Sequence, residues 1–102
     1  MIVIRVNVNI KPEEKENFKG FLQQEMIDVK QFSGCKRFHL YEDVNDPNAF
    51  LLYEEWQTLA DFDTYRNSDF FQQNGQNLFP MMAQPPDSDY FQATKMEQAN
   101  AN

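Results

Sequence analysis

The segment at residues 50–56, with the sequence FLLYEEW, most constrains what this chain can fold into. This strongly apolar and aromatic run is typical of a strand, in which alternate side chains point to opposite faces. A strand with one face in water alternates apolar with polar throughout. Here both faces carry large apolar groups, which predicts a sheet covered on two sides. One face holds Phe50, Leu52, Glu54 and Trp56, and the other holds Leu51, Tyr53 and Glu55.

The chain has 102 residues, which is room for one domain with one core. A chain this short has little to spare for covering both faces of its own sheet, so we expect a second copy to cover one of them. Ten Phe, four Tyr and one Trp indicate a folded chain that can enclose an apolar cavity.

The net charge of -7 argues against nucleic acid and against an anionic membrane surface as partners. No stretch approaches the length of a membrane span, and the start lacks the features of a signal peptide, so we expect a cytoplasmic protein. Cys35 is the one cysteine, which excludes an intrachain disulfide. His39 is the one histidine, which excludes two-histidine iron sites and zinc sites of several His and Cys ligands. A magnesium site made of carboxylates alone stays open, but no Asp/Glu cluster has a spacing that points to one, and we expect no metal site.

Hydrophobic periodicity, helix caps and turn residues predict the order of the elements. Thr58 and Ser68 have the residue types and following sequence of helix N-caps. In the second strand we place Phe38 and Leu40 on one face, and Cys35 with Arg37, His39 and Tyr41 on the other. We expect strands at residues 2–10, 35–43, 49–57 and 90–93, with helices from Pro12 to about residue 30, from Thr58 and from Ser68.

The resulting order is β-α-β-β-α-β, the ferredoxin-like arrangement of the α+β class. Its antiparallel sheet carries helices on one face, so the other face must be polar or must meet a partner. Because the strand at 49–57 is apolar on both faces, the sequence predicts a homodimer through the sheet face, a dimeric α/β barrel. We expect the domain to span residues 1–94, followed by a polar tail over residues 95–102.

Several motifs in the chain resemble the antibiotic biosynthesis monooxygenase family, over roughly residues 1–92. The Tyr-Glu-x-Trp element followed by a helix and Ser-x-x-Phe is the more specific part. The motifs are GCKRF at 34–38, YED at 41–43, DP at 46–47, FLLYEEW at 50–56, Leu59 and SDFF at 68–71.

The resemblance implies a dimeric ferredoxin-like barrel. Some members of the family oxygenate quinols or anthrone-type polyketides with molecular oxygen and neither metal nor flavin. Relatives degrade haem, and another processes the autoinducer-2 signal. Two features depart from the family pattern. Tyr65 stands where relatives commonly have histidine, and residues 72–75 (QQNG) stand where haem-degrading relatives carry the haem ligand. The resemblance therefore disfavours haem binding, because the haem ligand would have to come from His39, which lies on a different element.

Glu54 is a candidate catalytic base. A carboxyl group desolvated by apolar neighbours has a raised pKa, which suits the removal of a phenolic or enolic proton. An electron-rich anion formed in this way can pass an electron to oxygen. The alternative is a structural acid, hydrogen-bonded to a backbone or tyrosine donor or across the dimer.

Trp56, Asn7 and His39 are the other catalytic candidates. Trp56 could stack on a flat substrate or simply pack in the core. Asn7 could orient a carbonyl or peroxide, or be solvated or dimer-facing. His39 could act as a base, or lie at the surface or the interface. We expect the substrate pocket to be bordered by Phe50, Leu52, Phe62, Tyr65 and Phe71.

Together these features predict a cofactor-independent monooxygenase acting on a small or polycyclic quinol-like or anthrone-like aromatic. One alternative is a non-catalytic dimer that binds a small hydrophobic ligand. Another is an isomerase for a small phosphorylated, autoinducer-2-type signal, which would need cationic groups in its pocket.

Overall fold

Seven regular elements of the computed structural model, which describes residues 1–98, build one sheet with helices packed against it. Short 3-10 turns at Pro12–Glu14, Val29–Gln31 and Phe79–Met81 flank two of the helices. The elements are β1 (Ile2–Asn9), α1 (Lys15–Asp28), β2 (Cys35–Glu42), β3 (Ala49–Trp56), α2 (Leu59–Arg66), α3 (Asp69–Leu78) and β4 (Asp87–Gln92).

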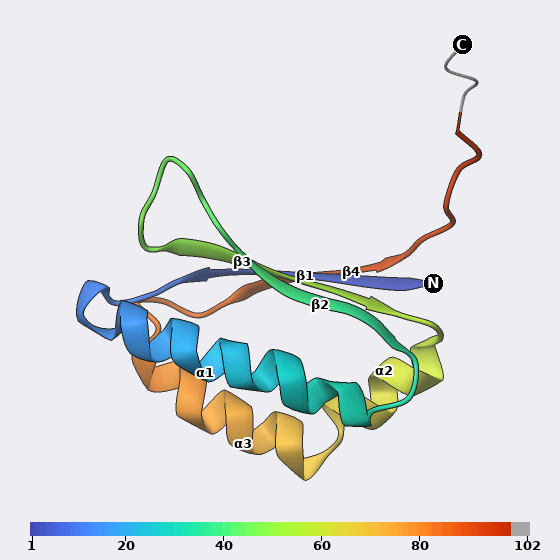
Figure 1. Cartoon of the computed structure of the whole chain (residues 1–102), viewed down its shortest axis with the longest axis horizontal. Helices are drawn as coiled ribbons and strands as arrows, with labels where there is room; N and C mark the ends of the chain where they lie inside the picture. The colour runs from blue at the N-terminus through green and yellow to red at the C-terminus, as the bar shows by residue number, and fades with distance from the viewer. Residues whose placement is uncertain (99–102) are drawn as a thin grey trace.

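The four strands are antiparallel and lie in the order β2-β3-β1-β4. All three α-helices lie on one side of the sheet, and the β2–β3 connection curves away on the uncovered side (Figure 1). The predicted ferredoxin-like fold is thus confirmed. The tail predicted over residues 95–102 lies partly outside the described residues, which end at residue 98.

Both predicted helix caps are present. The Thr58 hydroxyl accepts a hydrogen bond from the backbone N–H of Asp61 at 3.1 Å, and the Ser68 hydroxyl accepts one from the N–H of Phe71 at 3.1 Å. Each cap satisfies a backbone donor that the first turn of a helix leaves without a partner. The chain after β3 therefore forms two consecutive helices, α2 and α3, that turn back under the sheet.

The last strand begins earlier than residues 90–93, the predicted span, and covers Asp87–Gln92. Its first half is polar, so hydrophobic alternation could not indicate it. Backbone pairing with β1 and an ion pair between Arg5 and Asp89, at 3.0 Å, hold this edge strand in place. Tertiary pairing thus overrides a sequence of low strand propensity.

Cys35 lies on the opposite face of β2 from the one predicted. A register shift between Cys35 and Arg37 places Cys35 opposite Trp56 and Arg37 opposite Glu55. The extra residue of such a bulge reverses the alternation of side chains. Cys35 therefore packs against the core, while His39 and Tyr41 remain on the uncovered face as predicted.

Aromatic contacts join α1 and α2 to the covered face of the sheet. Phe18 of α1 packs on Phe50 with ring centroids 5.1 Å apart. Tyr65 of α2 stacks on Trp56 at 4.9 Å, with an interplanar angle of 25°. The buried apolar side chains lie in this layer between the sheet and the helices. They are Ile2, Ile4, Val8, Ile10, Phe18, Leu22, Val29, Phe38, Phe50, Trp56, Phe62 and Tyr65.

Gly34, in the connection before β2, is required by its backbone conformation and by its surroundings. Its φ of 83° lies in the left-handed region, and a Cβ there would collide with the Asp61 side chain. We expect Gly34→Ala to lower the free energy of unfolding by about 1–3 kcal/mol in urea denaturation.

Gly20 provides the matched control, because it lies in α1 and a Cβ added there would have nothing within 4 Å. Gly20→Ala should raise the free energy of unfolding by about 0.5–1 kcal/mol, since alanine favours helix. Wild-type stability in Gly34→Ala would contradict the requirement for glycine at position 34.

Candidate functional site

A cavity of about 240 Å³ lies between the covered face of the sheet and the helices. Its walls are mostly apolar, and two carboxyl groups, Glu25 and Glu54, lie among them. Four predicted pocket residues line it: Leu52 from β3, Phe62 and Tyr65 from α2, and Phe71 from α3. The other lining residues are Ile4, Val6, Asn74, Gly75, Leu78, Phe79, Pro86, Ser88 and Tyr90.

Glu54 lies in this cavity with 3% of its surface exposed. Its position in β3 directs it to the covered face, because every second residue of the strand points there. Oε1 accepts a hydrogen bond from the Trp56 indole N–H at 2.9 Å. Burial raises the pKa of Glu54 to about 7, and the nearby Glu25 adds to the rise while the Trp56 hydrogen bond opposes it.

Trp56 is fully buried and does not line the cavity. One face of its indole stacks on Tyr65, and its N–H is bound to Glu54. The structure therefore places Trp56 behind Glu54 rather than where a ligand in this cavity would stack on it. Phe50 is likewise absent from the lining and packs against Phe18 instead.

Glu25 is a site residue that the sequence analysis missed. It has 5% of its surface exposed, and its Oε2 accepts hydrogen bonds from the Tyr65 hydroxyl at 3.2 Å and from the Asn74 amide at 2.9 Å. Burial raises its pKa, while these two hydrogen bonds oppose the rise. The sequence held one indication, since Glu25 interrupts a helical apolar stripe that also contains Phe18, Leu22 and Val29.

Tyr65 connects the two carboxyl groups. Its hydroxyl binds Glu25 and its ring stacks on Trp56, which in turn binds Glu54. Burial and the neighbouring carboxyl groups raise the pKa of Tyr65, so its hydroxyl stays protonated and donates. Side chains from α1, α2, α3 and β3 thus converge on one cavity.

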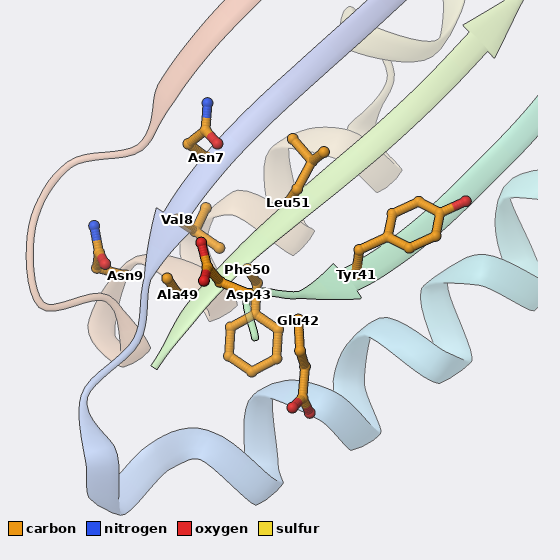
Figure 2. Close-up of a pocket in the computed structure, with 9 residues that line it drawn as sticks. All are labelled: Asn7, Val8, Asn9, Tyr41, Glu42, Asp43, Ala49, Phe50 and Leu51. Carbon is orange, nitrogen blue, oxygen red and sulfur yellow. The ribbon is translucent and has the colours of Figure 1, made fainter. Parts of the chain in front are cut away.

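Asn7 and His39 lie on the uncovered face of the sheet, away from this cavity. Asn7 lines a separate open hollow of about 420 Å³ near the β2–β3 connection. Figure 2 shows the side chains of Asn7 and Leu51 on the uncovered face of the sheet and the ring of Phe50 directed toward α1. His39 is exposed beside Tyr41, with ring centroids 6.3 Å apart. The fold therefore brings neither Asn7 nor His39 to Glu54.

Residues 72–75, the segment in which the family resemblance would place a haem ligand, lie in α3. Of these, Asn74 and Gly75 line the cavity. In the part of the chain that the structure describes, no group of three or more His, Cys, Asp or Glu side chains is arranged to hold a metal ion. None of the helices within residues 1–98 is both long and apolar enough to cross a membrane.

The model of one protein family, the antibiotic biosynthesis monooxygenases, matches residues 1–74. The chain therefore belongs to the antibiotic biosynthesis monooxygenase family, as its motifs predicted. The match covers β1 through most of α3, and so includes Glu25, Glu54, Trp56 and Tyr65.

Two relatives are similar in sequence. Uncharacterized protein sll1783 of Synechocystis is 29% identical over 84 residues, which are 82% of this chain and 57% of that protein. The chain thus spans little more than half the length of that relative. The Bacillus subtilis protein named "Putative monooxygenase YcnE" is 28% identical over 72 residues, which are 71% of this chain and 76% of that protein.

Solved structures show the same fold at low sequence identity. A Deinococcus radiodurans protein, described as a "putative antibiotic biosynthesis monooxygenase", superposes with a TM-score of 0.89 at 18% identity, covering 99% of this chain and 100% of its own. A conserved protein from Methanosarcina mazei Go1 superposes with a TM-score of 0.86 at 18% identity, covering 91% and 92%.

The raised pKa of Glu54 makes stability depend on pH. The folded protein holds this proton up to about pH 7, whereas the unfolded chain releases it near 4.5. Stability from this group is therefore greatest below pH 4.5 and falls as the pH rises toward 7 and above, by on the order of 3 kcal/mol in total. Glu25 acts in the same direction.

We expect Glu54→Gln to reduce this loss of stability between about pH 5 and pH 8, as measured by urea unfolding at both values. Glu16→Gln is the matched control, because Glu16 is exposed on α1 and should leave the pH dependence unchanged. A pH dependence in Glu54→Gln equal to that of the wild type would contradict the raised pKa.

Proposed function

We propose that the protein is a cofactor-independent monooxygenase that uses molecular oxygen to oxidise a small or polycyclic quinol-like or anthrone-like aromatic. Family membership supports the reaction class. The observation that carries the proposal is the position of Glu54, a buried carboxyl group with a pKa of about 7 in a mostly apolar cavity. A base with this pKa is suited to proton transfer at neutral pH.

In the proposed reaction, Glu54 takes a proton from the substrate hydroxyl or from its activated carbon. The resulting anion passes one electron to oxygen, and the two radicals combine to form a C–O bond. Glu54 returns its proton to the peroxide anion, which becomes a hydroperoxide. Glu54 then takes the remaining hydrogen of the oxygenated carbon as a proton while the O–O bond breaks, and it passes this proton to the departing hydroxide, so that a carbonyl group and water form. One oxygen atom stays in the product and the other becomes water, and the substrate supplies the electrons for both.

Trp56 has a positioning role in this proposal. Its indole N–H holds Oε1 of Glu54 at 2.9 Å and stabilises the ionised form, which keeps the pKa of the base from rising further. The stacking of Trp56 on Tyr65 fixes the indole, and so fixes the carboxyl group that it binds.

The lining of the cavity disfavours an isomerase for a phosphorylated molecule. Among the described residues, no Lys, Arg or His lines it, so a phosphate group would enter without a cationic partner and beside two acids. A dimer that binds a neutral hydrophobic ligand without turnover would fit the same lining. Oxygen consumption distinguishes that alternative from the monooxygenase.

We expect metal-free protein to consume oxygen with a panel of naphthalene diols and anthrones faster than the uncatalysed reaction. Glu54→Gln should lower kcat by about a hundredfold or more, because a glutamine cannot accept the proton. The wild-type rate should rise as the pH increases through about 7, where Glu54 becomes ionised.

Glu16→Gln is the control, since it makes the same change at an exposed position of α1. Tight binding of the panel without oxygen consumption would overturn the proposal in favour of a binding protein. A wild-type rate in Glu54→Gln would remove Glu54 from the mechanism.

We also propose that the uncovered face of the sheet joins two copies of the chain. Leu51, Tyr53 and Phe91 lie on this face, and none of them is buried within one chain. Its charged groups are largely matched within the chain, as Arg37 and Glu55 are at 3.7 Å. A face with paired charges and large apolar groups is suited to meeting a second copy of itself.

We expect the protein to sediment at micromolar concentration with twice its chain mass of 12.1 kDa. Leu51→Lys should shift it toward monomer, because the change places an unpaired charge in the proposed interface. Ile27→Lys is the control, since Ile27 is 62% exposed on α1, on the helical side of the molecule. A wild-type monomer at this concentration would contradict the dimer.

A further inference from the structure

Each carboxyl group in the cavity has one oxygen bound by the protein and one left over. Oε1 of Glu54 accepts the Trp56 indole N–H, and within residues 1–98 its Oε2 has no protein donor. Oε2 of Glu25 accepts both the Tyr65 hydroxyl and the Asn74 amide. Oε1 of Glu25 is buried and has no hydrogen-bond partner within the same residues.

An unsatisfied buried acceptor is destabilising, and more so when it is charged. Only 5% of the surface of Glu25 is exposed, so bulk water does not satisfy its Oε1. Because Glu25 lines the cavity, a small rotation of its carboxyl group would bring this oxygen to the cavity surface, where an occupant could donate a hydrogen bond to it. The orphaned oxygen therefore indicates what kind of molecule the cavity holds.

The two acids differ in the number of donors that stabilise their ionised forms. Glu25 has two, from Tyr65 and Asn74, whereas Glu54 has one, from Trp56. Glu25 is accordingly the acid that ionises more readily, and its free oxygen is then an acceptor. Tyr90 of β4 is a further titratable group in the lining of the cavity. Among the described residues, no basic side chain lines the cavity, so the charge of an ionised Glu25 is not offset.

We propose that Glu25 is a ligand-positioning residue whose Oε1 accepts a hydrogen bond from a second donor group of the ligand, while the first donor group meets Glu54. The inference rests on the proposed function in taking Glu54 as the group that meets the reacting hydroxyl. It narrows the ligand to a neutral molecule with two hydrogen-bond donors. A molecule that carries only hydrogen-bond acceptors leaves Oε1 of Glu25 without a partner. An anion is repelled by the charge of Glu25.

The same contact would assist the proposed oxidation. When Glu25 accepts a hydrogen bond from the second hydroxyl of an aromatic diol, electron density in the ring increases. An electron-richer ring passes an electron to oxygen more readily. Glu25 would thus place the ring relative to Glu54 and favour the reduced diol over its oxidised quinone.

Glu25→Gln gives a sharp test because it should exchange an acceptor for a donor. The amide oxygen of the glutamine would accept the hydrogen bonds of Tyr65 and Asn74, which leaves the NH₂ group at the position of Oε1. The variant should therefore lose its preference for a ligand donor and gain one for a ligand acceptor. The side chain keeps nearly the same size, so packing changes little.

The experiment measures binding without oxygen, by calorimetry, with three probes of one ring size: naphthalene-1,4-diol, 1-naphthol and 1,4-naphthoquinone. We expect the wild type to bind the diol about tenfold more tightly than either other probe, since each lacks a donor that the diol has. In Glu25→Gln the diol preference should disappear and the quinone should bind more tightly than to the wild type. Glu16→Gln, the same change at an exposed position of α1, should retain the wild-type order.

The wild-type comparison of diol with 1-naphthol stands even if Glu25→Gln does not fold. Equal binding of these two probes by the wild type would overturn the proposal. So would an unchanged order in folded Glu25→Gln, which would mean that Oε1 is satisfied by water from the cleft of about 100 Å³ between α1 and α3 that Glu25 also borders. The binding measurements contain no oxygen, so their outcome does not depend on whether the protein oxidises the ligand. If the probes bind in the expected order but the protein consumes no oxygen in the separate assay, the proposed reaction is refuted and the role of Glu25 stands.

Discussion

One hydrogen bond, from the Trp56 indole N–H to Oε1 of Glu54, allows an acid to occupy the buried face of the central sheet. Without a donor, a carboxyl group at 3% exposure would destabilise the strand that the fold is built around. The indole can supply this donor because residues two apart on a strand lie side by side on one face. The candidate site depends on this pairing, since it fixes both the place of Glu54 and the balance of its protonation.

The helices are attached to the sheet through the same pair of residues. Tyr65 stacks on Trp56 and extends its hydroxyl to Glu25, so α2 connects β3 to α1. Asn74 adds α3 to the same network. The cavity is the space that these aromatic and polar contacts leave between the two layers, and both of its acids are held by donors from neighbouring residues. Packing and the candidate chemistry therefore share the same side chains.

The sequence was sufficient for most of the fold because its patterns are local. The alternation of apolar and polar residues over β1, the apolar and aromatic run of β3, and the caps at Thr58 and Ser68 each specify structure within a few residues. Prediction failed where long-range pairing decided. The polar start of β4 forms a strand through its ladder with β1, and the bulge beside Cys35 reverses one side chain.

The candidate site likewise has one part that local sequence patterns predicted and one part that long-range packing decided. By itself, the sequence determined that Glu54 and Trp56 share a strand face with apolar neighbours, because a period of two follows from backbone geometry. Tertiary structure alone decided that Trp56 lies behind Glu54 and that Glu25 joins the cavity. Glu25 is hydrogen-bonded to Tyr65, which lies 40 positions further along the chain, and to Asn74, which lies 49 positions further. Contacts at such separations arise from how α1, α2 and α3 pack on the sheet rather than from any local pattern.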